Sequence, residues 1–213
     1  MTRANTASST PRRTRARRGE GEKLREQILE AGERLLIETG NEEAVTIRAV
    51  AEAVGVTPPS VYLHFADKDE LLFAICEQHF AQLDRVTEEA AAGADDLLES
   101  LALRGRAYIR FGIEHPEQYR ILFMRRPSHT PKSFQVDRLR DAAAIGHLVE
   151  HVSKCIQSGL IDGEPLLVSL GLWAVVHGLT SLLISKPEFP WPDLDVIIDH
   201  VCRTAIRGLQ SSP

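Results

Sequence analysis

The sequence has few of the residues that build sheets, disulfide frameworks or cysteine-rich metal sites. Only 6% of its 213 residues are aromatic, and runs of β-branched residues are scarce, so intrinsic propensity favours helix over most of the chain. The three cysteines, Cys76, Cys155 and Cys202, are odd in number and far apart, which argues against disulfides and against a CxxC metal site. We therefore expect an all-α fold and a reducing, cytoplasmic location.

Motifs for catalysis and for cofactor binding are lacking as well. The chain contains no HExxH sequence, no glycine-rich phosphate loop, no nucleophile with a base and no carboxylates paired at a usable spacing. We therefore predict that the protein is not an enzyme and that it has no catalytic residue, no metal ligand and no cofactor. An enzyme of helical fold is the weaker alternative.

Basic charge is concentrated in the first 18 residues. They contain six arginines and no acid, and the 25 basic residues less these six leave 19 against 30 acidic residues, a net charge of −11 for the rest. Such a separation predicts a disordered basic arm, residues 1–20, that meets nucleic acid or an acidic membrane surface. The alternative is a solvated tail without a partner. We do not expect a secretory signal, because no apolar stretch follows the arginines.

Start and stop signals divide the next 50 residues into short helices. Apolar periodicity predicts a helix over about 22–39, and Thr46 and Gly55 bound a second, short one. Thr57 before a proline starts a third, which ends at about residue 64 or 65, and Asp67 with Glu70 forms a capping box for a long fourth helix to about residue 92. This order is typical of a helix-turn-helix domain, which we assign to residues 21–66.

Longer helices follow and form a second domain over residues 67–213. The pattern predicts a loop from Pro127 to Ser133, a rigid connector from Lys186 to Pro192, and about nine helices in the whole chain, the later ones over 95–114, 116–125, 134–158, 164–185 and 193–209. From Leu166 to Ile184 there are 19 residues without a charge, long enough to cross a bilayer. Polar residues inside this segment and the lack of aromatic belts favour a helix buried on both faces, so we expect no membrane partner.

The segment TIRAVAEAVGVTPPSVYLHFADKDELL, residues 46–72, resembles the TetR family of bacterial repressors. Tyr62, His64, Phe65 and Lys68 match the recognition helix of that family, and the resemblance covers about residues 23–75. The segments at 115–124 and 172–183 look like the C-terminal domain of a subgroup marked by Trp-x-x-x-His-Gly. The resemblance implies a dimeric repressor that binds double-stranded DNA and is released by a small apolar or amphipathic effector, whose identity the sequence does not give.

The resemblance also implies which residues face DNA. They lie at the start of the second helix and along the recognition helix: Thr46, Arg48, Thr57, Pro58, Pro59, Ser60, Tyr62, His64 and Lys68. Their chemistry fits, because a guanidinium can bond a guanine edge while hydroxyl and ammonium groups suit phosphates. Pro58 departs from the family, in which many members carry a polar or basic side chain there. Each residue also has a purely structural interpretation, such as Tyr62 packing on the first helix.

Two further expectations concern the C-terminal domain. The resemblance implies a homodimer through residues 164–185 and 193–209, with the small residues Gly171, Ala174, Gly178 and Ser181 on one face and a seam of Ile197, Val201 and Ala205 on the other helix. An effector pocket should be apolar with a few polar anchors. The candidates, each of which is equally explained as core, are Tyr108, Phe111, Tyr119, Phe123, His147, Trp173 and His177.

The helix that begins at Asp67 is the only continuous rigid element that the sequence predicts between the two domains. A ligand that tilts this helix would change the separation of the two recognition helices in a dimer and so weaken DNA binding. The alternative function is a helical adaptor that does not bind DNA, in which the recognition helix is vestigial.

Overall fold

The computed structural model describes residues 20–123 and 143–210. The predicted arm, the loop at 127–133 and the first part of the helix predicted over 134–158 lie outside these ranges. The described ranges contain nine α-helices, one turn of 3₁₀ helix and no strand, which confirms the all-α prediction. The elements are α1 (Glu20–Thr39), η1 (Glu42–Ala44), α2 (Ile47–Val54), α3 (Pro58–Tyr62), α4 (Lys68–Ala91), α5 (Leu97–Glu114), α6 (Pro116–Phe123), α8 (Ala143–Gln157), α9 (Pro165–Ser185) and α10 (Leu194–Arg207).

Caps fix the bounds of the short helices. Thr46 Oγ1 accepts a hydrogen bond from the amide of Ala49 at 3.1 Å, and Gly55 ends α2 in the left-handed region at φ +77°, which a glycine adopts without a Cβ clash. Asp67 Oδ1 accepts from the amide of Glu70 at 2.8 Å and so begins α4. Thr57 stands at the N-cap of α3 but its side chain does not cap the helix.

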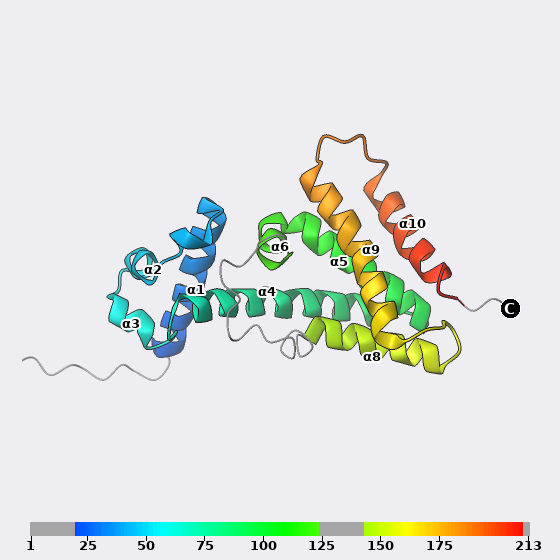
Figure 1. Cartoon of the computed structure of the whole chain (residues 1–213), viewed down its shortest axis with the longest axis horizontal. Coiled ribbons are helices and arrows are strands. Elements are labelled where there is room, and N and C mark those ends of the chain that lie inside the picture. The colour runs from blue at the N-terminus through cyan, green and yellow to red at the C-terminus, as the bar shows by residue number, and fades with distance from the viewer. Residues whose placement is uncertain (1–19, 124–142, 211–213) are drawn as a thin grey trace, which may run out of the picture.

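The first helices form a small group, here called the head, which consists of α1, η1, α2, α3 and the first two turns of α4 (Figure 1). Its core contains side chains that are almost completely buried, such as Ile28, Val50, Val61 and Phe65. Ala51 is 1% exposed, and its small side chain lets α2 pack closely on its neighbours. The core of the head extends beyond residue 66, because the start of α4 supplies one of its walls.

The remaining helices form a larger group, here called the body, in which α4 packs along α5 and α8. Helix α9 crosses α5 and lies beside α8 and α10 (Figure 1). A Cβ atom at Gly112 would overlap the methyl group of Thr180, so glycine is what lets α5 and α9 approach each other there. Ion pairs from Arg106 to Asp199 and from Arg110 to Asp195 join α5 to α10.

Among the described residues, α6 as well as α4 connects the head to the body. Helix α4 runs through both, as the sequence predicted. Helix α6 is a second link that the sequence did not predict: Ile121 packs into the core of the head, and Gln118 Nε2 donates to Glu33 Oε1 of α1 at 3.4 Å. The buried His79 of α4 lies beside the same carboxylate, with Nε2 at 3.3 Å from Glu33 Oε1. Helix α6 therefore contacts the head directly.

Candidate DNA-binding face and effector cavity

The residues predicted to face DNA all lie on the head, and none of them is fully buried. Thr46, Arg48, Thr57, Pro59 and Tyr62 are exposed, with Tyr62 at 53%. The other four, Pro58, Ser60, His64 and Lys68, are half-buried. Tyr62 is not part of the buried core of the head.

The charges on this face are partly compensated. Lys68 Nζ lies 3.5 Å from Glu43 Oε2, so a phosphate that binds this lysine has to compete with an exposed carboxylate. Arg48 takes part in no ion pair among the described residues. Phe65 lies under the guanidinium of Arg25, which is 5.1 Å from the ring centroid, and its burial makes it a structural residue.

Leu63 is an exposed residue beside the predicted DNA-facing residues that the sequence analysis does not propose. Leu63 is 76% exposed, the largest exposed fraction among the large apolar side chains of the described ranges. It directly follows the last residue of α3. The start of α1 lies nearby, because a Cβ at Gly21 would be 3.9 Å from His64 Cε1.

A cavity of about 340 Å³ lies in the body between α4, α5, α6, α8, α9 and α10. Its size falls in the lower part of the range found for small-molecule sites. Apolar side chains dominate its wall, and Thr87, Arg104 and Tyr108 supply polar groups. The apolar residues that line it include Phe80, Leu83, Leu101, Leu122, Phe123, Ile145, Leu148, Leu172, Trp173, Val176 and Ile206.

Three of the seven predicted ligand residues line this cavity: Tyr108, Phe123 and Trp173. Phe111 and Tyr119 are buried in the core and do not line it. His177 lies behind the wall and bonds Tyr119, and His147 lies on an exposed part of α8 against α4. The sequence identified residues that pack in the body but not the side of the core that each one faces.

A buried polar network stands behind the wall of the cavity. Trp173 Nε1 donates to Tyr108 Oη at 3.1 Å, while His177 Nδ1 lies 2.6 Å from Tyr119 Oη and 3.2 Å from Tyr108 Oη. Burial lowers the pKa of His177 and raises the pKa of both tyrosines. The Nδ1 atom of neutral His177 can therefore accept a hydrogen bond from a tyrosine hydroxyl. Tyr108 and Trp173 connect this network to the cavity.

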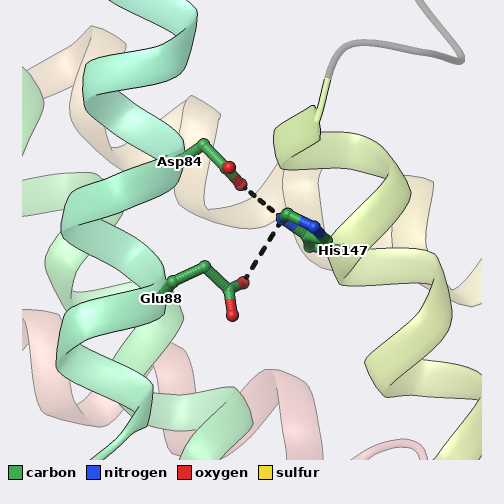
Figure 2. Close-up of side chains that lie close together, drawn as sticks. All are labelled: Asp84, Glu88 and His147. Carbon is green, nitrogen blue, oxygen red and sulfur yellow. Dashed lines mark hydrogen bonds and ion pairs between the residues drawn. The ribbon is translucent and has the colours of Figure 1, made fainter.

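A second cluster lies where α4 meets α8 (Figure 2). His147 Nδ1 is 2.9 Å from Asp84 Oδ1 and 3.8 Å from Glu88 Oε1. The hydrogen bond to Asp84 raises the pKa of His147. Arg104, which lines the cavity, binds both carboxylate oxygens of Glu88 and lowers its pKa. In the sequence analysis His147 is a ligand candidate only, since 63 residues separate it from Asp84 and nothing in the sequence pairs the two.

Helix α9 presents an apolar surface that the single chain leaves uncovered. By length and composition alone it could cross a membrane. Only 28% of its most apolar 18-residue stretch is buried within the chain. Neither Gly171 nor Gly178 has a neighbour within 4 Å of a Cβ position. The exposed apolar residues of α9 lie on one side of the helix and are Leu167, Leu170, Ala174, Val175 and Leu182.

The head, with α2 and α3 joined by the turn at Gly55, has the arrangement of a helix-turn-helix DNA-binding domain, and the body is a helical domain that encloses a cavity. Two family models match the chain: bacterial regulatory proteins of the tetR family over residues 28–75, and the tetracyclin repressor-like C-terminal domain over residues 101–206. The chain therefore belongs to the TetR family of DNA-binding transcriptional regulators. Members of this family are not enzymes.

Curated relatives carry names of both activators and repressors. The HTH-type transcriptional activator FasR of Mycolicibacterium smegmatis is 27% identical over 152 residues, which are 71% of this chain and 68% of the relative. The transcriptional repressor KstR of the same organism is 31% identical over 59% of this chain and 58% of its own length. The repressor AcnR of Corynebacterium glutamicum is 33% identical over 45% and 43%. The chain thus spans about half the length of the latter two.

Solved structures show the same fold. A protein of unknown function from Rhodococcus sp. RHA1 superposes with a TM-score of 0.73 at 24% identity, covering 88% of this chain and 96% of that one. A TetR family transcription regulator from Marinobacter aquaeolei VT8 has a TM-score of 0.71 at 22% identity, covering 91% and 98%. At these identities the likeness establishes the fold alone.

Proposed function

We propose that the protein is a cytoplasmic, homodimeric repressor that binds an inverted-repeat operator through α2 and α3 and is released by a small apolar or amphipathic effector. One observation carries this proposal. The helices α4 and α6 both contact the head, which exposes residues of α2 and α3, and both also line the apolar cavity of about 340 Å³ in the body. The relatives named as repressors support the sign of the regulation. An activator, as FasR is named, is the second candidate.

On the DNA side, different residues have different tasks. Arg48 is exposed near the start of α2 and is suited to bond a guanine edge in the major groove. Thr46, Tyr62 and Lys68 carry hydroxyl and ammonium groups that suit phosphates. Leu63 offers an apolar contact for a thymine methyl group. The arm of six arginines precedes α1 in the sequence and adds affinity that does not depend on sequence.

The exposed face of α9 is the basis of the proposed dimer. A second copy would cover the apolar residues of this face by two-fold symmetry, and the small side chains at Gly171, Ala174 and Gly178 allow close approach. Helix α10 contributes Leu194 and Val196, which are 41% and 63% exposed. The predicted seam residues Ile197, Val201 and Ala205 are half-buried, because they already contact the core or cavity of their own chain.

The cavity and the head communicate through α6 as well as α4. Phe123 lines the cavity, while Gln118 and Ile121 of the same helix contact α1 and the core of the head. A ligand that displaces Phe123 moves α6 against α1 and changes the spacing of the two heads of a dimer. Trp173 and His177, the residues of the Trp-x-x-x-His-Gly segment, contact this phenylalanine, with ring centroids 6.0 Å and 5.2 Å from that of Phe123. Their place beside the cavity supports assignment to that subgroup.

The test measures DNA affinity by mobility shift or anisotropy, on DNA selected from the genome and on random DNA. Tyr62→Ala and Lys68→Ala should weaken binding to both DNAs and reduce its salt dependence, because both residues meet phosphates. Arg48→Ala should instead relax base preference by about 1–3 kcal/mol at one position per half-site.

Matched controls come from the body, where the chain offers exposed residues of the same kind. Phe189 is 56% exposed, Arg85 is exposed on α4 and Lys154 on α8, and their alanine variants should bind DNA as the wild type does. If the head variants bind as tightly as these controls, the adaptor function without DNA binding is correct and the proposal is wrong.

A further inference from the structure

The cluster between α4 and α8 has the donors of a metal site. Asp84 and Glu88 are four residues apart on α4 and therefore lie on one face of the helix, and His147 reaches them from α8 (Figure 2). One carboxylate oxygen from each acid and one imidazole nitrogen all lie within 4.8 Å of one another. Two carboxylates with one imidazole are a donor set that divalent transition metals accept.

The spacing of these atoms is close to that of a bound ion. Zinc binds nitrogen and oxygen at about 2.0–2.2 Å in a tetrahedral arrangement, which places its ligands roughly 3.4 Å from one another. The distances from His147 Nδ1, 2.9 Å to Asp84 and 3.8 Å to Glu88, lie on either side of this value. The two carboxylate oxygens lie within 4.8 Å of each other, so side-chain rotation can bring the three donors around an ion.

The surroundings favour an ion at this place. Asp84 has a side chain only 14% exposed, and among the described residues its carboxylate is paired with no lysine or arginine. Its ion-pair partner among the described residues is His147, and a metal cation would further offset the cost of burying this charge. His147 is 46% exposed, so the third side of the cluster is open to an entering ion and to water ligands.

We propose that Asp84, Glu88 and His147 bind a divalent transition metal ion, with Zn²⁺ as the best match to one imidazole and two carboxylates. Arg104 is a positioning residue for this site, because its guanidinium orients Glu88 and offsets one of the two negative charges. Glu88 retains lone pairs for the metal while it accepts from Arg104. The ion would join α4, the helix that runs into the head, to α8.

The same arginine links the metal to the effector cavity. Arg104 lines the cavity on one side and binds Glu88 on the other. A metal ion at Glu88 therefore fixes a cavity wall residue, and the metal site lies beside the effector site without sharing its apolar lining. Metal binding itself does not depend on the proposed repressor function and is tested without DNA.

The experiment titrates Zn²⁺ into the tag-free, chelator-treated full chain and follows the heat of binding and the melting temperature. The wild type should bind one ion per chain at this site and melt at a higher temperature with the ion, because a ligand of the native state stabilises it. His147→Ala and Asp84→Asn should each weaken that binding by about tenfold or more, since each removes a ligand atom. Mg²⁺ should bind far more weakly, because it prefers oxygen ligands.

Two control variants separate this site from general binding at the surface. Glu89, next to Glu88, is exposed and faces Arg85, and His200 is exposed on α10. Glu89→Gln and His200→Ala should bind Zn²⁺ as the wild type does. Melting without metal shows whether each variant is folded. Equal affinity in the wild type and in folded His147→Ala, or the absence of binding in the wild type, would show that the cluster is an ordinary ion pair and overturn the proposal.

Discussion

The head and the body of this protein use their residues in opposite ways. In the head, the buried side chains are tightly packed and the candidate functional residues point outward from α2 and α3. In the body, the candidate functional residues line an interior cavity or stand behind its wall, and the outer face of α9 is apolar. A DNA-binding surface therefore depends on local order along the chain. An effector site depends instead on how helices that are far apart in the sequence pack together.

The largest effect should come from removing one phenylalanine in each region. Phe65 is 1% exposed in the core of the head, while Phe123 is half-buried and borders the cavity. Phe65→Ala should lower the free energy of unfolding by about 3–5 kcal/mol, and Phe123→Ala by at least about 1 kcal/mol less, because fewer atoms surround a side chain beside a void. Urea unfolding followed by circular dichroism measures both. Equal losses would mean that the body is as tightly packed as the head.

A smaller effect should appear in the pH dependence of the body, where two histidines act with opposite sign. Burial lowers the pKa of His177 below its ordinary value of 6.5. As the pH falls, this histidine therefore binds a proton in the unfolded chain before it does so in the folded chain. Stability is lost as the pH falls through 6.5 toward the folded pKa. The partner Asp84 raises the pKa of His147 above 6.5, so that histidine adds stability as the pH falls through its folded pKa.

Single substitutions separate the two contributions. Between about pH 8 and pH 5, His177→Gln should lose less stability than the wild type and His147→Gln should lose more. Melting temperatures across this range, measured in the presence of a chelator, provide the check. Parallel curves for all three proteins would show that neither histidine changes its pKa on folding.

The sequence predicted the head closely because its signals are local. Thr46, Gly55 and Asp67 stand at the ends of helices, where capping chemistry fixes the backbone. The end of α3 was the exception: the helix stops at Tyr62 and not at residue 64 or 65. The resemblance added the residues expected to face DNA, and the structure places them on the head with none of them fully buried.

The body could be predicted only in outline, since its sites join residues that are far apart in the chain. His177 meets Tyr119 across 58 residues and His147 meets Asp84 across 63, and no periodicity in one sequence reports such a pairing. An aromatic residue type predicts burial but not the direction in which the ring points. The sequence therefore could not distinguish Phe111, which lies in the core, from Phe123, which lies at the cavity. The contact of α6 with the head depends in the same way on packing.

The most direct test of the proposed dimeric regulator is the number of chains bound to DNA selected from the genome, measured by sedimentation together with a footprint. We predict two chains on an inverted repeat whose half-sites lie about 34–36 Å apart or a multiple of that, because a two-fold dimer presents two recognition helices. Gly178→Leu should place a bulky side chain in the exposed face of α9 and yield monomers that bind this DNA weakly. A single wild-type chain protecting an asymmetric site would contradict the account.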